Sequence, residues 1–147
     1  MKIILIAFLS IFIACVNGVA QERACLRAEA IEAEKSIPYL NSWNDIHASY
    51  KKYKHCDDGA IAEAFSDVIV RQIAFNWDQI NELIDLSNID KDFFEFVLSH
   101  IDSTAAESSI ENIIINSNEQ CPESAFSECT MIKNFAKKAL RELKSAK

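Results

Sequence analysis

The stretch HCDDGAIAEAFSDVIVRQI, residues 55–73, decides the fold of this chain of 147 residues. Its apolar side chains recur at spacings of three and four, which places them on one face of an α-helix; they are Ile61, Phe65, Val68, Ile69 and Ile73. Asp57 and Asp58 stand just before this stripe, and aspartate is a preferred residue at a helix N-terminus. The stretch therefore predicts a helix that starts beside Cys56 and buries one face.

Stripes with the same period continue along the chain. A first helix is expected near Cys25, and apolar stripes mark five further ones at 43–53, 77–84, 94–101, 110–114 and 126–143. The chain holds only two glycines and two prolines, too few for the turns of a β-sandwich or barrel. The sequence therefore predicts an all-α, disulfide-braced bundle of about six to seven helices, in one domain at residues 21–147.

Three local features refine this prediction. Asp90 is expected to cap the helix that follows it. Thr104 and Glu107 have the spacing of a capping box at the start of the next helix. Trp43 and Trp77 share their helical register with apolar neighbours, which favours a place in the core over a role as exposed interface anchors.

The N-terminal segment has the pattern of a signal peptide. Lys2 supplies a positive charge, and residues 3–14 are an apolar run that is too short to span a bilayer. Gly18 and Ala20 place small residues where a signal peptidase reads the chain. We therefore expect residues 1–20 to be removed and the protein to be exported, either to the periplasm or to the medium.

A second interpretation takes residues 12–15 as a lipoprotein-type site, in which Cys15 would be acylated and become the first residue. Phe and Ile are poor occupants of that motif. Under either interpretation Cys15 is unavailable for a disulfide, and an even number of cysteines remains.

The remaining cysteines are Cys25, Cys56, Cys121 and Cys129. In an exported chain, disulfide pairing is expected ahead of metal binding or nucleophilic chemistry. We pair Cys121 with its neighbour Cys129 and Cys25 with Cys56, each bridge stabilising the fold by roughly 2 to 4 kcal/mol. The alternative, in which Cys25 and Cys56 each bond to one of the last two cysteines, stays open on the sequence alone.

Charge is distributed unevenly. Residues 55–129 hold sixteen Asp and Glu against Arg71 and Lys91, whereas residues 130–147 hold six Lys and Arg against Glu142. An acidic surface of this kind repels nucleic acid and attracts basic proteins or cations. The basic tail lacks the interleaved aromatic residues of a nucleic-acid surface. We therefore expect no nucleic acid partner.

Recognisable catalytic or metal motifs are missing from the sequence. His47, His55 and His100 form no His-x-x-x-His pair, and the best cluster for a cation is His55 beside Asp57 and Asp58. The chain has neither a Gly-x-Ser-x-Gly elbow nor a glycine-rich phosphate loop. The sequence therefore predicts a protein that is not an enzyme and uses no metal or cofactor.

Three strings carry a resemblance to a known family. They are residues 53–67 (YKHCDDGAIAEAFSD), residues 96–102 (FVLSHID) and residues 120–122 (QCP). On these strings the chain resembles a family of small exported bacterial proteins of unassigned function, over about residues 46 to 132. In size, export, helicity and disulfides it is also similar to the periplasmic immunity proteins that neutralise cell-wall amidases delivered by type VI secretion. That second similarity is one of architecture, without a shared motif.

Two hypotheses for function follow. The first is a non-catalytic protein-binding module, such as an immunity or inhibitor protein that occludes a toxin or hydrolase in the bacterial envelope. Its binding residues are expected to be Asp57, Asp58, Glu63 and Asp67, because complementary charge on a rigid surface favours tight inhibition. The second is a carrier of a small apolar ligand, whose binding cavity the nine phenylalanines could line. Either protein is compatible with a homodimer.

Overall fold

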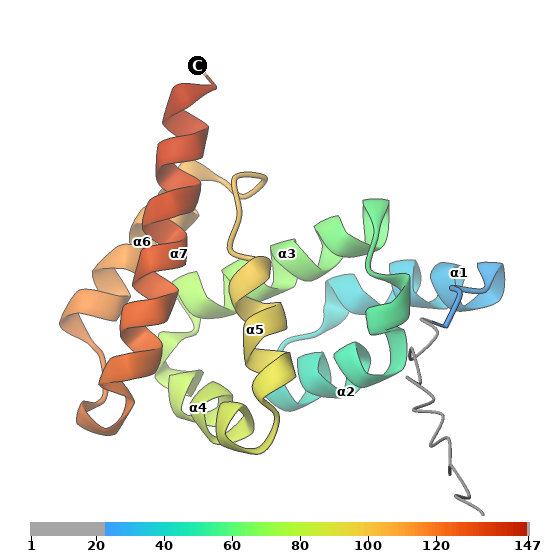
Figure 1. The fold of residues 1–147 in the computed structure, drawn as a ribbon, viewed down its shortest axis with the longest axis horizontal. Helices are drawn as coiled ribbons and strands as arrows, with labels where there is room; N and C mark the ends of the chain where they lie inside the picture. Colours follow the sequence, from blue (N-terminus) through green and yellow to red (C-terminus); the bar gives the residue numbers. More distant parts are fainter. Residues whose placement is uncertain (1–22, 147) are drawn as a thin grey trace, which may run out of the picture.

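The computed structural model describes residues 23–146 (Figure 1), so the predicted signal peptide and Cys15 lie outside the described residues. Over that range the chain forms seven α-helices and no β-strand, which confirms the predicted all-α fold. The α-helices are α1 (Arg27–Ser36), α2 (Trp43–Tyr53), α3 (Gly59–Phe75), α4 (Ile80–Ile89), α5 (Lys91–Ser99), α6 (Glu107–Glu119) and α7 (Phe126–Ser145). Short 3₁₀-helices lie between them: η1 (Ile37–Tyr39), η2 (Lys54–Cys56), η3 (Trp77–Gln79) and η4 (Glu123–Ala125).

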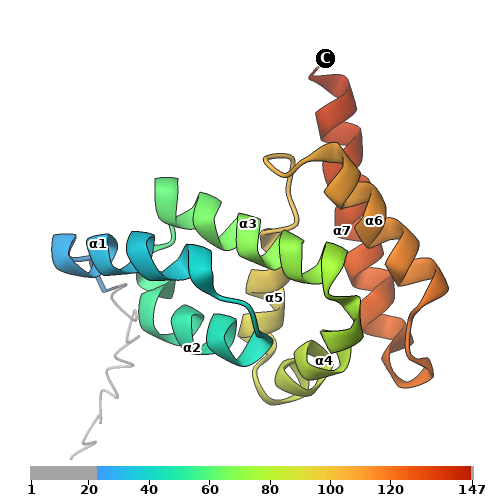
Figure 2. The same ribbon diagram turned by 180° about the vertical axis from the view of Figure 1, so that it is seen from behind.

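Helix α3 runs through the middle of the molecule (Figures 1 and 2). It packs against α1 and η1 on the N-terminal side and against α6 on the other. α6 and α7 lie side by side as a hairpin at one end, and the last turns of α7 project beyond the rest of the molecule (Figure 1). The elements from both ends of the chain therefore meet on α3.

The core forms along the face of α3 that the sequence predicts. All five stripe residues between Ile61 and Ile73 are at most 4% exposed. The Phe65 ring meets the Phe96 ring of α5 edge to face, with ring centroids 5.0 Å apart, an arrangement that aromatic pairs favour. Trp43 and Trp77 are also buried, so the prediction that both belong to the core is confirmed.

Two of the predicted helix caps are present. The Asp58 carboxylate accepts a hydrogen bond of 2.8 Å from the backbone N–H of Gly59 and caps α3. Gly59 has φ of +51°, a conformation that glycine adopts without strain, and no heavy atom lies within 4 Å of the position that a Cβ would take. Asp90 caps α5 by accepting from the backbone N–H of Phe93 at 3.1 Å, as predicted.

The predicted capping box of α6 is wrong. Thr104 donates from its backbone N–H and from its hydroxyl to the Asp102 carboxylate, at 2.8 and 2.6 Å. Asp102 therefore holds Thr104 in a turn of its own, and α6 begins at Glu107 with Ala106 in the N-cap position.

Both disulfides have the predicted pairing. Cys25 bonds to Cys56, which ties the segment before α1 to the end of η2, and the two Cα atoms are 4.9 Å apart. Cys121 bonds to Cys129 and ties the turn after α6 to the first turns of α7, with the Cα atoms 6.1 Å apart. The structure therefore excludes the alternative pairing between the two halves of the chain.

The basic last helix rests partly on acidic residues of its neighbour. Lys144 Nζ on α7 lies 3.6 Å from Glu107 and 3.9 Å from Glu111 of α6. This contact pairs the positive tail with part of the negative segment that precedes it. Within residues 23–146, no helix is both long enough and apolar enough to cross a membrane.

A buried position and an exposed position on α4 give a matched test of this core. Leu83 is fully buried, so we expect Leu83→Ala to lower the free energy of unfolding by about 2 to 5 kcal/mol through lost burial and a cavity. Ile89 is 81% exposed, and Ile89→Ala should change the free energy of unfolding by less than about 0.5 kcal/mol. Urea titrations followed by circular dichroism measure both, and equal effects would contradict the packing described.

Candidate functional site

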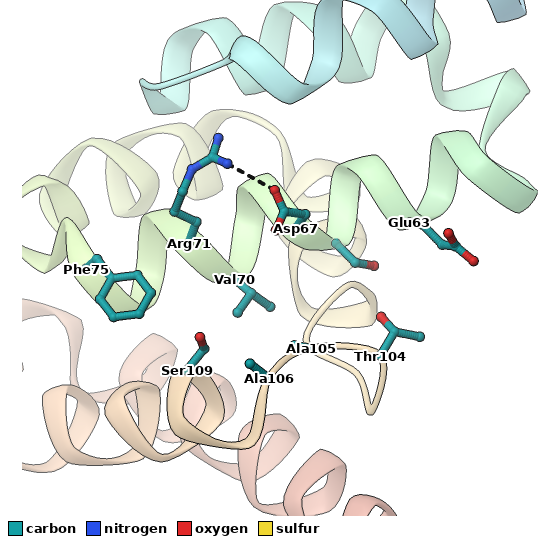
Figure 3. Close-up of a pocket in the computed structure, with 10 residues that line it drawn as sticks. Glu63, Asp67, Val70, Arg71, Phe75, Thr104, Ala105, Ala106 and Ser109 are labelled. Carbon is teal, nitrogen blue, oxygen red and sulfur yellow. Dashed lines mark hydrogen bonds and ion pairs between the residues drawn. The ribbon is translucent and has the colours of Figure 1, made fainter.

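A groove lies between α3 and the chain that leads into α6 (Figure 3). It encloses about 480 Å³, and its lining residues are Glu63, Ser66, Asp67, Val70, Arg71, Phe75, Thr104, Ala105, Ala106 and Ser109. The α3 residues recur at spacings of three and four, so one face of the helix forms a whole wall. The opposite wall is the short loop whose turn Asp102 organises.

The two ends of the groove differ in chemistry. Glu63 lies toward one end and Phe75 at the other, with Val70 between them facing the loop (Figure 3). Phe75 is 60% exposed, whereas Val70 is 4% exposed. The groove therefore offers a carboxylate, an apolar floor and an exposed ring along a single helix.

Arg71 fixes α3 relative to the N-terminal part of the molecule. Its guanidinium donates to the Asp67 carboxylate at 2.9 Å and to the backbone carbonyls of Pro38 and Leu40 at 3.3 and 3.1 Å. Three acceptors in fixed positions suit the planar donor array of arginine. Arg71 is therefore held in place, and it neutralises Asp67.

The four predicted binding residues are used in different ways. Asp57 faces His100, with 3.2 Å between its Oδ2 and the ring Nε2, and Asp58 caps α3. Asp67 is paired with Arg71. Glu63 is exposed, and among residues 23–146 no ion pair involves it. Only Glu63 and Asp67 line the groove, so the structure does not bring all four into one site.

A polar network adjoins the groove and shares Ser66 with its lining. Ser66 Oγ is 2.9 Å from His100 Nδ1, and it donates to the Asp102 carboxylate at 3.2 Å. His100 reaches Asp57 through its other ring nitrogen. Ser66 and His100 are 4% and 5% exposed. The network therefore connects α3, the segment just before it and the loop after α5.

Serine, histidine and aspartate are also the residue types of acyl-transfer sites. Here Ser66 sits inside α3, where neighbouring backbone N–H groups bond along the helix and cannot stabilise an oxyanion. Its hydroxyl is also shared between His100 and Asp102. These contacts support a structural role, which is to hold the loop wall of the groove against α3.

All three histidines of the chain contact a carboxylate, in the pairs His47–Asp90 at 2.9 Å, His55–Glu29 at 3.1 Å and His100–Asp57 at 3.2 Å. Each pair joins segments that are far apart in the sequence. The proposed grouping of His55 with Asp57 and Asp58 does not form, because His55 turns to Glu29 and Asp57 turns to His100. The hydrogen bond from His55 is the main cause that lowers the pKa of Glu29.

Sequence reasoning missed Ser66, His100 and Asp102 as a unit. Ser66 and Asp57 belong to the string at residues 53–67, and His100 and Asp102 belong to the string at residues 96–102. These two stretches of the sequence therefore meet in this network. Their separation in the sequence gave no sign of that contact.

The Ser66 network gives a prediction for stability. We expect Ser66→Ala to lower the free energy of unfolding by about 1 to 3 kcal/mol, because it leaves His100 and Asp102 without their shared hydroxyl. Ser108, an exposed serine on α6, supplies the control variant Ser108→Ala, which should change it by less than about 0.5 kcal/mol. Chemical denaturation measures both, and a neutral Ser66→Ala would contradict the network.

The His47–Asp90 pair gives a prediction for pH. Its hydrogen bond, helped by the Phe93 N–H and by Lys51, lowers the pKa of Asp90 to about 2 from the ordinary 3.8. Because the folded-state pKa is depressed, the stabilisation is complete above about pH 4 and is lost as the pH falls toward 2. Asp90→Asn keeps a capping side chain but removes the charge. Its deficit in unfolding free energy should be largest near pH 6 and shrink toward pH 2; a constant deficit would contradict the assignment.

Comparison with family models, curated proteins and solved structures finds no match for this chain. Its function is therefore inferred from its own residues and their geometry.

Proposed function

We propose that this chain is a non-catalytic, exported protein-binding module that occludes a partner toxin or hydrolase in the bacterial envelope. The observation that supports this proposal is the groove of Figure 3, where Glu63 and the exposed Phe75 ring flank an apolar floor. A ring that remains 60% exposed beside a groove is the type of residue that anchors protein interfaces.

Hydrogen bonds within the chain hold both walls of the groove in place. Arg71 bonds α3 to the η1 segment, and the Ser66 network holds the opposite loop. A preordered surface loses little conformational entropy on binding, so more of the contact energy appears as affinity. This rigidity suits an inhibitor that acts by covering its target.

The chemistry of the groove favours a partner with one basic and one apolar side chain. The Glu63 carboxylate would attract a basic side chain of the partner. Val70 and Phe75 would contact an apolar side chain at the other end of the groove. The formal net charge of the chain is −7, which would steer a basic partner surface toward it. A protruding loop that carries one basic and one apolar residue would fit both ends.

The test is recovery of a partner from bacterial envelope extracts by four variants of the oxidised protein. We expect Glu63→Lys and Phe75→Ser each to reduce recovery of the partner by about tenfold or more, the loss of an interface anchor. Asp85→Lys and Ile89→Ser make the same chemical changes at exposed positions on α4, outside the groove, and should leave recovery unchanged. Binding through Glu63 should also weaken with added salt.

Equal recovery by the groove and α4 variants would overturn the groove as the binding surface. Native mass spectrometry that finds a retained lipid and no protein partner would favour the carrier hypothesis instead. Recovery of a second copy of the chain alone would point to a homodimer.

A further inference from the structure

A second cluster of functional side chains lies around the first disulfide, apart from the groove. Glu29 on α1 and His55 and Cys56 on η2 place one potential metal-ligand atom each within 4.8 Å of one another. His55 Nε2 is 3.1 Å from Glu29 Oε2, and the sulfur of Cys25 is bonded to that of Cys56. An imidazole, a carboxylate and the Cys56 sulfur therefore lie together, and the Cys25 sulfur is bonded to the last of these.

These four groups are a ligand set that zinc uses. Zinc binds thiolate, imidazole and carboxylate in a tetrahedron, with ligand bonds of about 2.0 to 2.3 Å. Ligand atoms in such a tetrahedron lie about 3.3 to 3.8 Å apart, so Glu29 and His55 are already close to the required separation. In the oxidised protein the sulfurs are bonded to each other, and neither is a thiolate.

We propose that reduction of the Cys25–Cys56 disulfide converts this cluster into a four-ligand zinc site. A dithiol reductant supplies two electrons and two protons, so the Sγ–Sγ bond breaks, two thiols form and the reductant becomes a disulfide. Zinc then replaces the thiol protons, which pass to solvent, and binds both thiolates, His55 and Glu29. The metal takes over the link between α1 and η2 that the disulfide makes when oxidised.

The surroundings fit this conversion. Cys25 lies in the exposed segment before α1, where its sulfur can move away from that of Cys56, whereas Cys56 is 4% exposed and fixed. The Glu29 carboxylate accepts hydrogen bonds from Arg23 and from the backbone N–H of Leu26, which hold it toward His55. Arg23 also balances the single negative charge that two thiolates, a carboxylate and a zinc ion leave.

An entry path for the ion is present. The cluster borders a surface cavity of about 480 Å³ whose lining includes Arg23, Cys25, His55 and Cys56. The side chains of His55 and Glu29 are 13% and 21% exposed, so the ligand atoms are shielded but not sealed. The second disulfide has no such set, since among the described residues no comparable group gathers around Cys121 and Cys129.

The test measures zinc bound by the full chain before and after treatment with a phosphine reductant, with metal content read by mass spectrometry after desalting. The reduced protein should retain one zinc ion and the oxidised protein none. Cobalt in place of zinc should give the absorption bands of thiolate ligation in the reduced form only. Circular dichroism checks that the reduced chain stays helical.

Two sets of variants identify the ligands. Cys121→Ser with Cys129→Ser removes the other disulfide and should leave zinc binding intact. His55→Ala and Glu29→Gln should each weaken zinc binding by about tenfold or more, because each removes one of four ligands. A reduced, helical protein that binds no zinc would overturn the proposal, and so would binding that survives both ligand changes or depends on Cys121 and Cys129.

Discussion

Burial of one face of α3 is the constraint on which the rest of the structure depends. The stripe from Ile61 to Ile73 is almost completely removed from water, and α1, η1 and α6 pack against the helix that carries it. At roughly 25 cal/mol per Å² of apolar surface, such burial is the main favourable contribution to folding. Once α3 is placed, its opposite face has a fixed position relative to η1 and to the loop before α6, and this relation creates the groove.

Polar contacts then fix the positions of the two groove walls. Arg71 reaches two backbone carbonyls of the N-terminal part, and Ser66 reaches the loop after α5. Both side chains extend from α3, so a single helix organises the core on one side and both groove walls on the other. The buried hydrogen bond between Ser66 and His100 costs stability when one partner is lost, which makes that contact specific.

The fold was largely predictable because helical periodicity and cysteine spacing are local signals. The stripes at Ile61–Ile73, the caps at Asp58 and Asp90 and both disulfide pairs are confirmed. The site was less predictable, since it depends on contacts across long separations. His100 and Asp57 are 43 residues apart, and their contact pairs Asp57 with an imidazole of the same chain. The capping box at Thr104 failed for a related reason, because Asp102 competes for the same side chain.

The connectivity of the two disulfides has a consequence for how the chain matures. Among the four cysteines that the structure describes, each bridge joins neighbours in the order of synthesis, Cys25 with Cys56 and Cys121 with Cys129. Cys25 and Cys56 are made, and can pair, before Cys121 exists as part of the chain. If the chain oxidises as it emerges, Cys56 meets Cys25 before Cys121 and Cys129 are made, and cross-pairing among these four requires that the first bridge be delayed. Among these four cysteines, the order of synthesis thus favours the native connectivity over the alternative pairing.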